Sequence, residues 1–214
     1  TTGLYNQAYR LADLPATQIG EQFGDVLVPS FARVEDKEQR KTAVLRAAGI
    51  LALVVFPLAI GLGAISLTLV EAFYPPSYAG VGPFLAVLAV LSVFRPIGVL
   101  VMGYLQVVGR TLAYMWLDLL KVVTIIGSMF VLSRFGPVWA CAGVGIGFGL
   151  NAIQMVWAMK PDGYSPVALL KTMAPPLVAC GLMGLTVVAI RGPLIGLGLS
   201  PWLRLVIEVA VGGI

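Results

Sequence analysis

Long uncharged runs alternate with short polar segments along most of the chain. Runs that could cross a membrane are bounded by charged or turn residues and cover 47–70, 83–108, 111–133, 135–159 and 171–190, with a further run from Pro201. The complete runs are close to the roughly 20 residues that a helix needs to span a bilayer. Backbone groups at bilayer depth must be hydrogen-bonded within the segment, so these runs are predicted to be helices.

The first segment, residues 4–33, is more polar and carries a regular polar stripe. One helical face would hold Asn6, Arg10, Asp13, Thr17 and Glu21, with Asp25 at its edge. Such a stripe fits either an amphipathic helix on the membrane surface or a spanning helix that lines a water-filled cavity. A surface helix favours Lys and Arg on its polar face. Carboxylates and neutral groups dominate here, so the stripe favours the cavity-lining helix.

Composition narrows the class of protein. Of the 214 residues, 59% are hydrophobic and 11% charged, whereas roughly a quarter of a typical soluble chain is charged. We therefore predict an all-α integral membrane protein, residues 1–214 forming a single bundle of about six to seven transmembrane helices. The chain begins without Met and stops within its last predicted helix, so we expect a fragment, truncated at both ends, of a larger transporter.

Basic residues near the ends of the predicted helices favour one side of the membrane. That side collects Arg33, Lys37, Arg40, Lys41, Arg46, Arg110, Lys160 and Lys171. The other side has only Arg134, Arg191 and Arg204, with Arg10 just inside it. Because cytoplasmic loops are enriched in Lys and Arg, the loop 34–46 is predicted to be cytoplasmic and residue 1 to lie outside.

Arg95 lies near the middle of the run 83–108 and is followed by Pro96. A guanidinium stays charged in proteins, and a charge near the bilayer centre costs about 2.5–3.5 kcal/mol on insertion scales. It therefore usually faces a cavity, a partner or a pathway. Pro96 removes a backbone donor, which suits a bending helix beside a cavity. A structural ion pair with one of the acids is the alternative.

Three further charges lie inside predicted helices. Asp118 and Lys121 are three residues apart and can pair with each other, which leaves open mutual neutralisation or a role in a polar cavity. Glu208 could be a coupling-ion site or a helix-packing contact. The basic residues suggest an anionic cargo, because Arg binds phosphate through charge-assisted hydrogen bonds.

Signatures of enzymes and cofactors are missing from the sequence. The chain has no His, no cluster with metal-ligand spacing and no serine in a nucleophile elbow. Cys141 and Cys180 lie in apolar runs and are interpreted as packing residues. The run "GVGIGFG" (143–149) is interpreted as small-residue helix packing rather than a nucleotide-binding loop. We therefore expect a protein that is not an enzyme and that binds no metal, cofactor or nucleic acid. A membrane glycosyltransferase or polymerase is the less favoured alternative to a transporter.

The segment "GLYNQAYRLADLPATQIGEQFGDVLVPSFARVED" and the following "LRAAGILALVVFPLAIGLGAISLTLVEAFYPPSYAGVGPFLAVLAVLSVFRPIGVL" are distinctive. Together they resemble the polysaccharide transporter (O-antigen flippase) family of the multidrug/oligosaccharidyl-lipid/polysaccharide (MOP) exporter superfamily. Arg10 matches the arginine of the family's "AYRL" pattern, and Arg95 matches its intrahelical arginine. Asp118, Lys121 and Glu208 correspond to no shared motif.

The resemblance implies a multi-pass protein of the bacterial inner membrane, with two helical bundles around a central cavity. This chain would be the C-terminal lobe, and its partners the missing N-terminal lobe, membrane lipids and oligosaccharide linked to undecaprenyl diphosphate. The oligosaccharide would be an O-antigen, capsule or exopolysaccharide unit; the alternatives are a peptidoglycan-precursor flippase or a multidrug exporter. The expected substrate-binding residues are Asn6, Arg10, Asp13, Arg95 and Lys121, with Glu21, Asp25 and Asp118 as ion-coupling candidates.

Overall fold

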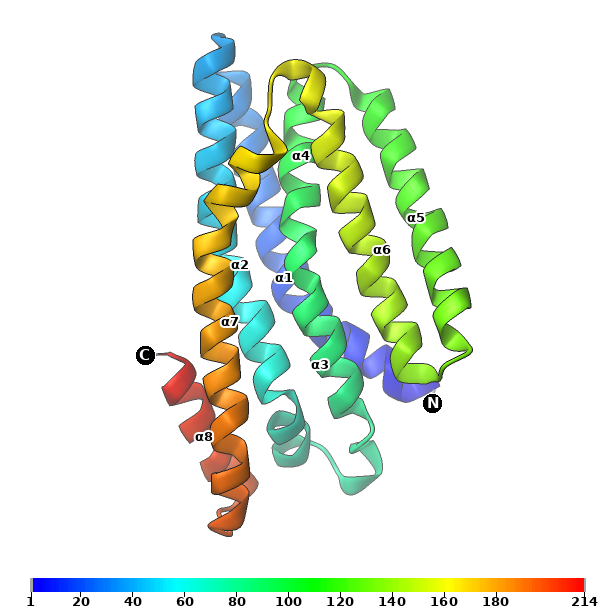
Figure 1. The fold of residues 1–214 in the computed structure, drawn as a ribbon, viewed down its shortest axis with the longest axis vertical. Coiled ribbons are helices and arrows are strands. Elements are labelled where there is room, and N and C mark those ends of the chain that lie inside the picture. The colour runs from blue at the N-terminus through cyan, green and yellow to red at the C-terminus, as the bar shows by residue number, and fades with distance from the viewer. Residues whose placement is uncertain (1, 214) are drawn as a thin grey trace.

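The computed structural model describes the backbone of residues 2–213, and the side chains of all of these except residues 2, 5, 14–21, 24 and 25. Within this range the chain is an all-helical bundle (Figure 1), as predicted. Its helices are α1 (Thr2–Ala32), α2 (Lys37–Phe73), α3 (Val81–Leu91), α4 (Arg95–Val107), α5 (Thr111–Ser133), α6 (Pro137–Ala158), α7 (Pro166–Gly196) and α8 (Pro201–Gly212). Short 3₁₀ turns are η1 (Pro76–Tyr78), η2 (Ser92–Phe94) and η3 (Lys160–Asp162).

Local sequence signals set several helix boundaries. The carboxylate of Asp36 accepts a hydrogen bond of 2.9 Å from the backbone N–H of Gln39 and so caps α2. Gly136 has a φ of 122°, which allows the chain to reverse between α5 and α6. Proline then occupies the first turn of the helices that follow the tight connections: Pro137, Pro166 and Pro201.

Five of the described helical segments are long and apolar enough to cross a membrane. They are α2, the continuous segment formed by α3 and α4, α5, α6 with η3, and α7. The more polar α1 and the short α8 complete the bundle. That these two helices also cross the membrane, as a count of six to seven requires, stays a prediction. The chain is a multi-pass membrane protein.

The helices pack around a core that leaves α5 on the outside. Helix α1 contacts α3 and α4, α2 contacts α3 and α7, and α8 lies against α2 and α7. Helix α5 contacts mainly α6 and has no buried residue. In Figure 1 it forms one edge of the molecule, whereas α1 passes behind α3 and α4. The polar helix α1 is therefore an integral part of the bundle.

The glycines of α6 lie at two close helix contacts. A Cβ atom on Gly143 would lie 2.9 Å from backbone atoms of α5, and one on Gly147 would lie 2.9 Å from the Cα atom of Ile125. Gly145 and Gly149 lie instead against side chains of α3 and η2. Small residues allow backbones to approach this closely. The interpretation of this run as helix packing is confirmed.

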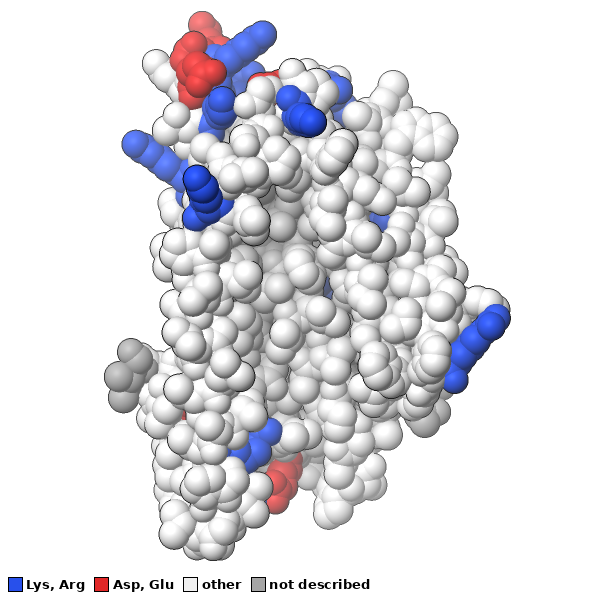
Figure 2. All heavy atoms as spheres, viewed as in Figure 1, with Lys and Arg blue, Asp and Glu red and all other residues white. Residues whose placement is uncertain are grey.

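Charged side chains gather at the ends of the bundle and leave the middle largely apolar. Figure 2 shows Lys, Arg, Asp and Glu at the upper end, where α1 ends and α2 begins. The connection between α4 and α5 and the turn η3 lie at this same end (Figure 1). The basic residues predicted to share one side of the membrane therefore lie at one end of the molecule.

Candidate functional site

The membrane-spanning segment between Val81 and Val107 is interrupted near its middle. Helix α3 ends at Leu91, residues 92–94 form η2, and α4 begins at Arg95. Pro96 lies in the first turn of α4, where a missing backbone N–H costs little because that group would have no partner within the helix. The interruption, which Pro96 predicts, places Arg95 about halfway along the span.

Arg95 is bound by side chains from α1 and α6. Its guanidinium forms an ion pair with Asp13 and donates a hydrogen bond of 3.4 Å to the hydroxyl of Tyr9, both on α1. The Cζ atom lies 4.8 Å from the ring centre of Phe148 in α6, within the range of a cation–π contact. Its Nε atom is buried without a hydrogen-bond partner among the described residues. An acid, a hydroxyl and an aromatic ring thus hold the charge in place.

The Arg95–Asp13 pair corresponds to the structural ion pair that the sequence left as an alternative. The pair is only partly buried, because 17% of the Arg95 side chain and 31% of the Asp13 side chain are exposed. Asp13 therefore borders on space that another group could enter. A structural pairing in this conformation does not prevent Arg95 from binding an anion in another.

A cavity of about 160 Å³ connects Arg95 with a second ion pair. Residues of α4, α5 and α6 line it, among them Asp118, Lys121 and Asn151. Lys121 donates to the carboxylate of Asp118, as its spacing predicts. The Nδ2 atom of Asn151 donates to the carbonyl of Leu117 at 3.1 Å, joining α6 to α5. Asp118 and Lys121 therefore neutralise each other and also line the cavity beside Arg95.

The remaining predicted site residues all lie on α1. Asn6 and Arg10 are exposed, and neither has a hydrogen bond or ion pair among the side chains that the structure describes. Glu21 and Asp25 belong to α1 as well, but their side chains lie outside the described residues. The structure therefore brings together four of the predicted residues: Asp13, Arg95, Asp118 and Lys121.

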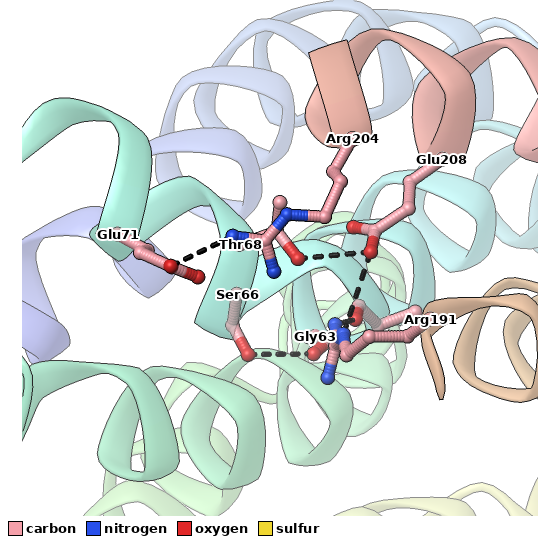
Figure 3. A network of polar contacts seen from close by, with 8 residues as sticks. Gly63, Ser66, Thr68, Glu71, Arg191, Arg204 and Glu208 are labelled. Carbon is pink, nitrogen blue, oxygen red and sulfur yellow. Dashed lines mark hydrogen bonds and ion pairs between the residues drawn. The ribbon is translucent and has the colours of Figure 1, made fainter. Parts of the chain in front are cut away.

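A second polar cluster lies where α8 packs against α2 and α7 (Figure 3). The carboxylate of Glu208 is completely buried. Its Oε1 atom accepts hydrogen bonds from the Thr68 hydroxyl at 2.8 Å and from Nε of Arg191 at 3.4 Å. Arg191 also donates to the backbone carbonyl of Ala64. Glu208 thus joins three helices, which is the helix-packing role left open by the sequence.

The same cluster includes an ion pair that sequence reasoning missed. Arg204 of α8, which is buried, donates to the carboxylate of Glu71 at the end of α2 over 2.7 Å. Arg204 and Glu208 are four residues apart and so share one face of α8. This spacing is the signal that could have indicated a polar contact face on this helix.

Comparisons of sequence match part of this chain to known proteins. Residues 1–83 match a protein family described as "Polysaccharide biosynthesis protein". The Teichuronic acid biosynthesis protein TuaB of Bacillus subtilis (strain 168) is 32% identical over 94 residues, which make up 44% of this chain and 20% of TuaB. The matched family segment includes the polar stripe of α1 and ends before Arg95.

Comparison of structure covers nearly the whole chain. The Lipid II flippase MurJ, in an inward closed conformation, superposes with a TM-score of 0.75 over 98% of this chain at 13% sequence identity. At this identity the likeness establishes the fold. The chain corresponds to 44% of the MurJ chain, so it spans less than half the length of that protein.

Proposed function

We propose that this chain, which resembles the polysaccharide transporters of the MOP superfamily, is part of a flippase for lipid-linked oligosaccharide. The family model that matches residues 1–83 is described as a polysaccharide biosynthesis protein, and the fold is shared with a protein named as a flippase. The cargo would be an oligosaccharide on undecaprenyl diphosphate, moved across the bacterial inner membrane. The chain would form the C-terminal lobe, paired with an N-terminal lobe outside this sequence.

The ion pair between Arg95 and Asp13 is the observation that carries the proposal. A charge half-way along a span is costly and usually serves a pathway. The carboxylate of Asp13 holds the guanidinium while no cargo is bound. A diphosphate offers the same kind of oxygen acceptors and can replace that carboxylate through charge-assisted hydrogen bonds. The partial exposure of Asp13 supports such an exchange.

The other predicted site residues are assigned to binding the sugars of the cargo and to coupling transport to an ion. Asn6 and Arg10 are exposed on α1, on the side where Asp13 lies, and could bind sugar hydroxyls. Lys121 adds a second cation beside the cavity of Arg95. Asp118, Glu21 and Asp25 are the candidates for ion coupling. Transport would proceed by alternating access, with the two lobes rocking around a central site as in other repeat-built transporters.

A peptidoglycan-precursor flippase is the second candidate, and the fold favours it. The structure that superposes over 98% of the chain is named as a Lipid II flippase. The sequence matches instead favour polysaccharide, because both the family description and TuaB concern polysaccharide or teichuronic acid biosynthesis. The oligosaccharide is therefore the preferred cargo.

The test uses the complete gene product that contains this chain, in inverted membrane vesicles. Movement of undecaprenyl-diphosphate-linked oligosaccharide is measured for the wild type and for the double variant Arg95→Gln/Asp13→Asn. This variant removes both charges, so that no unpaired charge is left to unfold the bundle. The matched control, Glu71→Gln/Arg204→Gln, removes an ion pair between α2 and α8 away from the cavity.

We expect transport per folded molecule to fall at least about tenfold in the Arg95/Asp13 variant, the loss of one charge-assisted contact or more. The control variant should transport within about twofold of the wild type. Normal transport by the Arg95/Asp13 variant would make this pair purely structural and remove the proposed diphosphate site. Movement of peptidoglycan precursor or drug instead of oligosaccharide would leave the assigned fold unchanged but would show that the proposed cargo is wrong.

A further inference from the structure

A polar pocket opens at the basic end of the bundle, apart from the cavity beside Arg95. It has a volume of about 230 Å³ and lies between the start of α2, the end of α4 and the connection from η3 to α7. Seven residues line it: Lys37, Arg40, Tyr104, Val108, Pro161, Asp162 and Tyr164. A water molecule takes about 30 Å³ in the liquid, so the pocket has room for a phosphate group.

The lining of this end pocket carries positive charge that its own acid does not cancel. Asp162 is engaged by Arg110, whose Nη1 atom lies 3.0 Å from the carboxylate. Arg40 donates from Nε and Nη2 to the carbonyl of Val34, at 3.0 and 2.6 Å, which fixes its guanidinium. Lys37 is exposed and has no hydrogen bond or ion pair among the described side chains. One fixed and one unpaired cation therefore face the pocket.

Two tyrosines form the inner wall of the end pocket. Tyr104 and Tyr164 are each 4% exposed, and their rings meet edge to face with centres 4.8 Å apart. Burial raises the pKa of Tyr164 to about 12, against the opposing effects of the Tyr104 hydroxyl and the charge of Arg40. The Tyr164 hydroxyl therefore stays protonated at neutral pH and is available as a hydrogen-bond donor.

The position of the end pocket indicates where its ligand would come from. It lies at the end of the molecule where basic residues gather (Figure 2), which the positive-inside rule predicts to be the cytoplasmic side. Anionic lipids of that leaflet attract basic groups near the membrane surface. Tyrosines are also typical of the membrane–water interface. A phosphate at headgroup level is the anion that this position would meet.

We propose that the end pocket binds the phosphate of a phosphate ester, with an anionic membrane phospholipid as the expected ligand. Lys37 and Arg40 would bind the phosphate oxygens, and Tyr164 would donate a further hydrogen bond. A phosphate is recognised by such a set of cations and hydroxyl donors. This lipid site does not depend on the transport function proposed above, because the cargo there meets Arg95 and not Lys37.

The test measures binding of phosphatidylglycerol to the purified complete gene product by native mass spectrometry. Phosphatidylcholine is the zwitterionic comparison, and sn-glycerol phosphate added as a competitor represents a soluble phosphate ester. The variant is Lys37→Gln, which removes a charge that makes no structural contact in the described residues. The matched control is Lys171→Gln, an exposed lysine of α7 outside the pocket lining.

We expect Lys37→Gln to bind phosphatidylglycerol about five times more weakly, which corresponds to about 1 kcal/mol for one basic residue at a membrane surface. Lys171→Gln should bind like the wild type. Displacement of the lipid by sn-glycerol phosphate would make the phosphate ester itself the ligand, and no displacement would assign the site to the lipid. Equal losses in both lysine variants, or equal binding of phosphatidylcholine, would overturn the proposal.

Discussion

Arg95 and Glu208 show two ways in which one bundle accommodates a charged side chain. The Arg95–Asp13 pair keeps part of both side chains accessible, and a cavity adjoins it. Glu208 is completely enclosed and joins α8 to α2 and α7. An accessible pair can exchange its partner, whereas an enclosed one can only be broken at high cost. The first arrangement suits binding and the second suits stability.

Substitution Asp13→Asn should destabilise the protein by less than about 3 kcal/mol. Removing one partner of a fully buried pair costs about 3–5 kcal/mol, and the partial exposure of Asp13 lowers that figure. The double variant Arg95→Gln/Asp13→Asn should regain most of the loss, because no unpaired charge remains. Thermal unfolding in detergent measures both. A double variant no more stable than Asp13→Asn would contradict the ion pair.

Substitution Glu208→Gln should cost about 3 kcal/mol, because Arg191 loses its carboxylate in an enclosed site. The Thr68 hydroxyl can still donate to the amide oxygen, so the loss arises from charge. The control is Glu38→Gln, whose side chain is 83% exposed beside Lys41 and should change stability by less than about 1 kcal/mol. The two midpoints in chemical denaturation are compared. Equal shifts of the two denaturation midpoints would show that the burial of Glu208 does not contribute to stability.

At the scale of elements, α5 packs mainly along a single neighbour, α6, through specific contacts. It has no buried residue, so it cannot be fixed by a core of its own. The Ser128 hydroxyl donates to the carbonyl of Gly143 at 2.7 Å, and Asn151 of α6 donates to Leu117 at 3.1 Å. Interhelical hydrogen bonds and small residues are the usual means of helix association in membranes. The glycine contact therefore positions Asp118 and Lys121 beside the cavity.

Substitution Gly143→Leu should separate α5 from α6. A Cβ atom there would lie 2.9 Å from backbone atoms of Met129 and Ser128, which cannot rotate away. The cost should be at least about 1–3 kcal/mol. Gly127→Leu on α5 is the control, because nothing lies within 4 Å of its Cβ position. Thermal stability distinguishes them, and a tolerated leucine at residue 143 would contradict the close approach of the two helices.

Most helix boundaries could be predicted, because charged residues and prolines mark them. The prediction of 111–133 agrees with α5, and 83–108 covers α3, η2 and α4 within two residues at either end. Helices α2 and α7 were predicted too short. Each continues past a charged residue, α2 from Lys37 and α7 beyond Arg191 to Gly196. A helix does not end where its apolar run ends, since its polar turns extend beyond the apolar zone.

At the scale of the whole molecule, contacts within one helix were predictable and contacts between helices were not. The pair of Asp118 and Lys121 follows from helical spacing. Asp13 and Arg95 are 82 residues apart, and Thr68 and Glu208 are 140 apart. No spacing rule joins such residues, because their meeting depends on how the helices pack. The sequence therefore predicts which charges need partners but not which partners they find.

The two ends of the molecule differ in charge, and this difference predicts how it lies in the membrane. The turn before α2 is at the basic end, and η1 lies at the opposite end (Figure 1). Gln39→Cys and Ser77→Cys would place one exposed thiol at each end. The native Cys141 and Cys180 are buried and are replaced by Ala to remove background.

A membrane-impermeant maleimide applied to spheroplasts should label the cysteine at position 77 and leave that at position 39 unlabelled until the membrane is opened. The physical reason is that basic loops are retained on the cytoplasmic side. Inverted vesicles should show the opposite order, which controls for intrinsic differences in thiol reactivity. Labelling at position 39 in intact spheroplasts would invert the topology. The end pocket would then face the outer leaflet, and the cytoplasmic lipid supply assumed for its phosphate site would no longer apply.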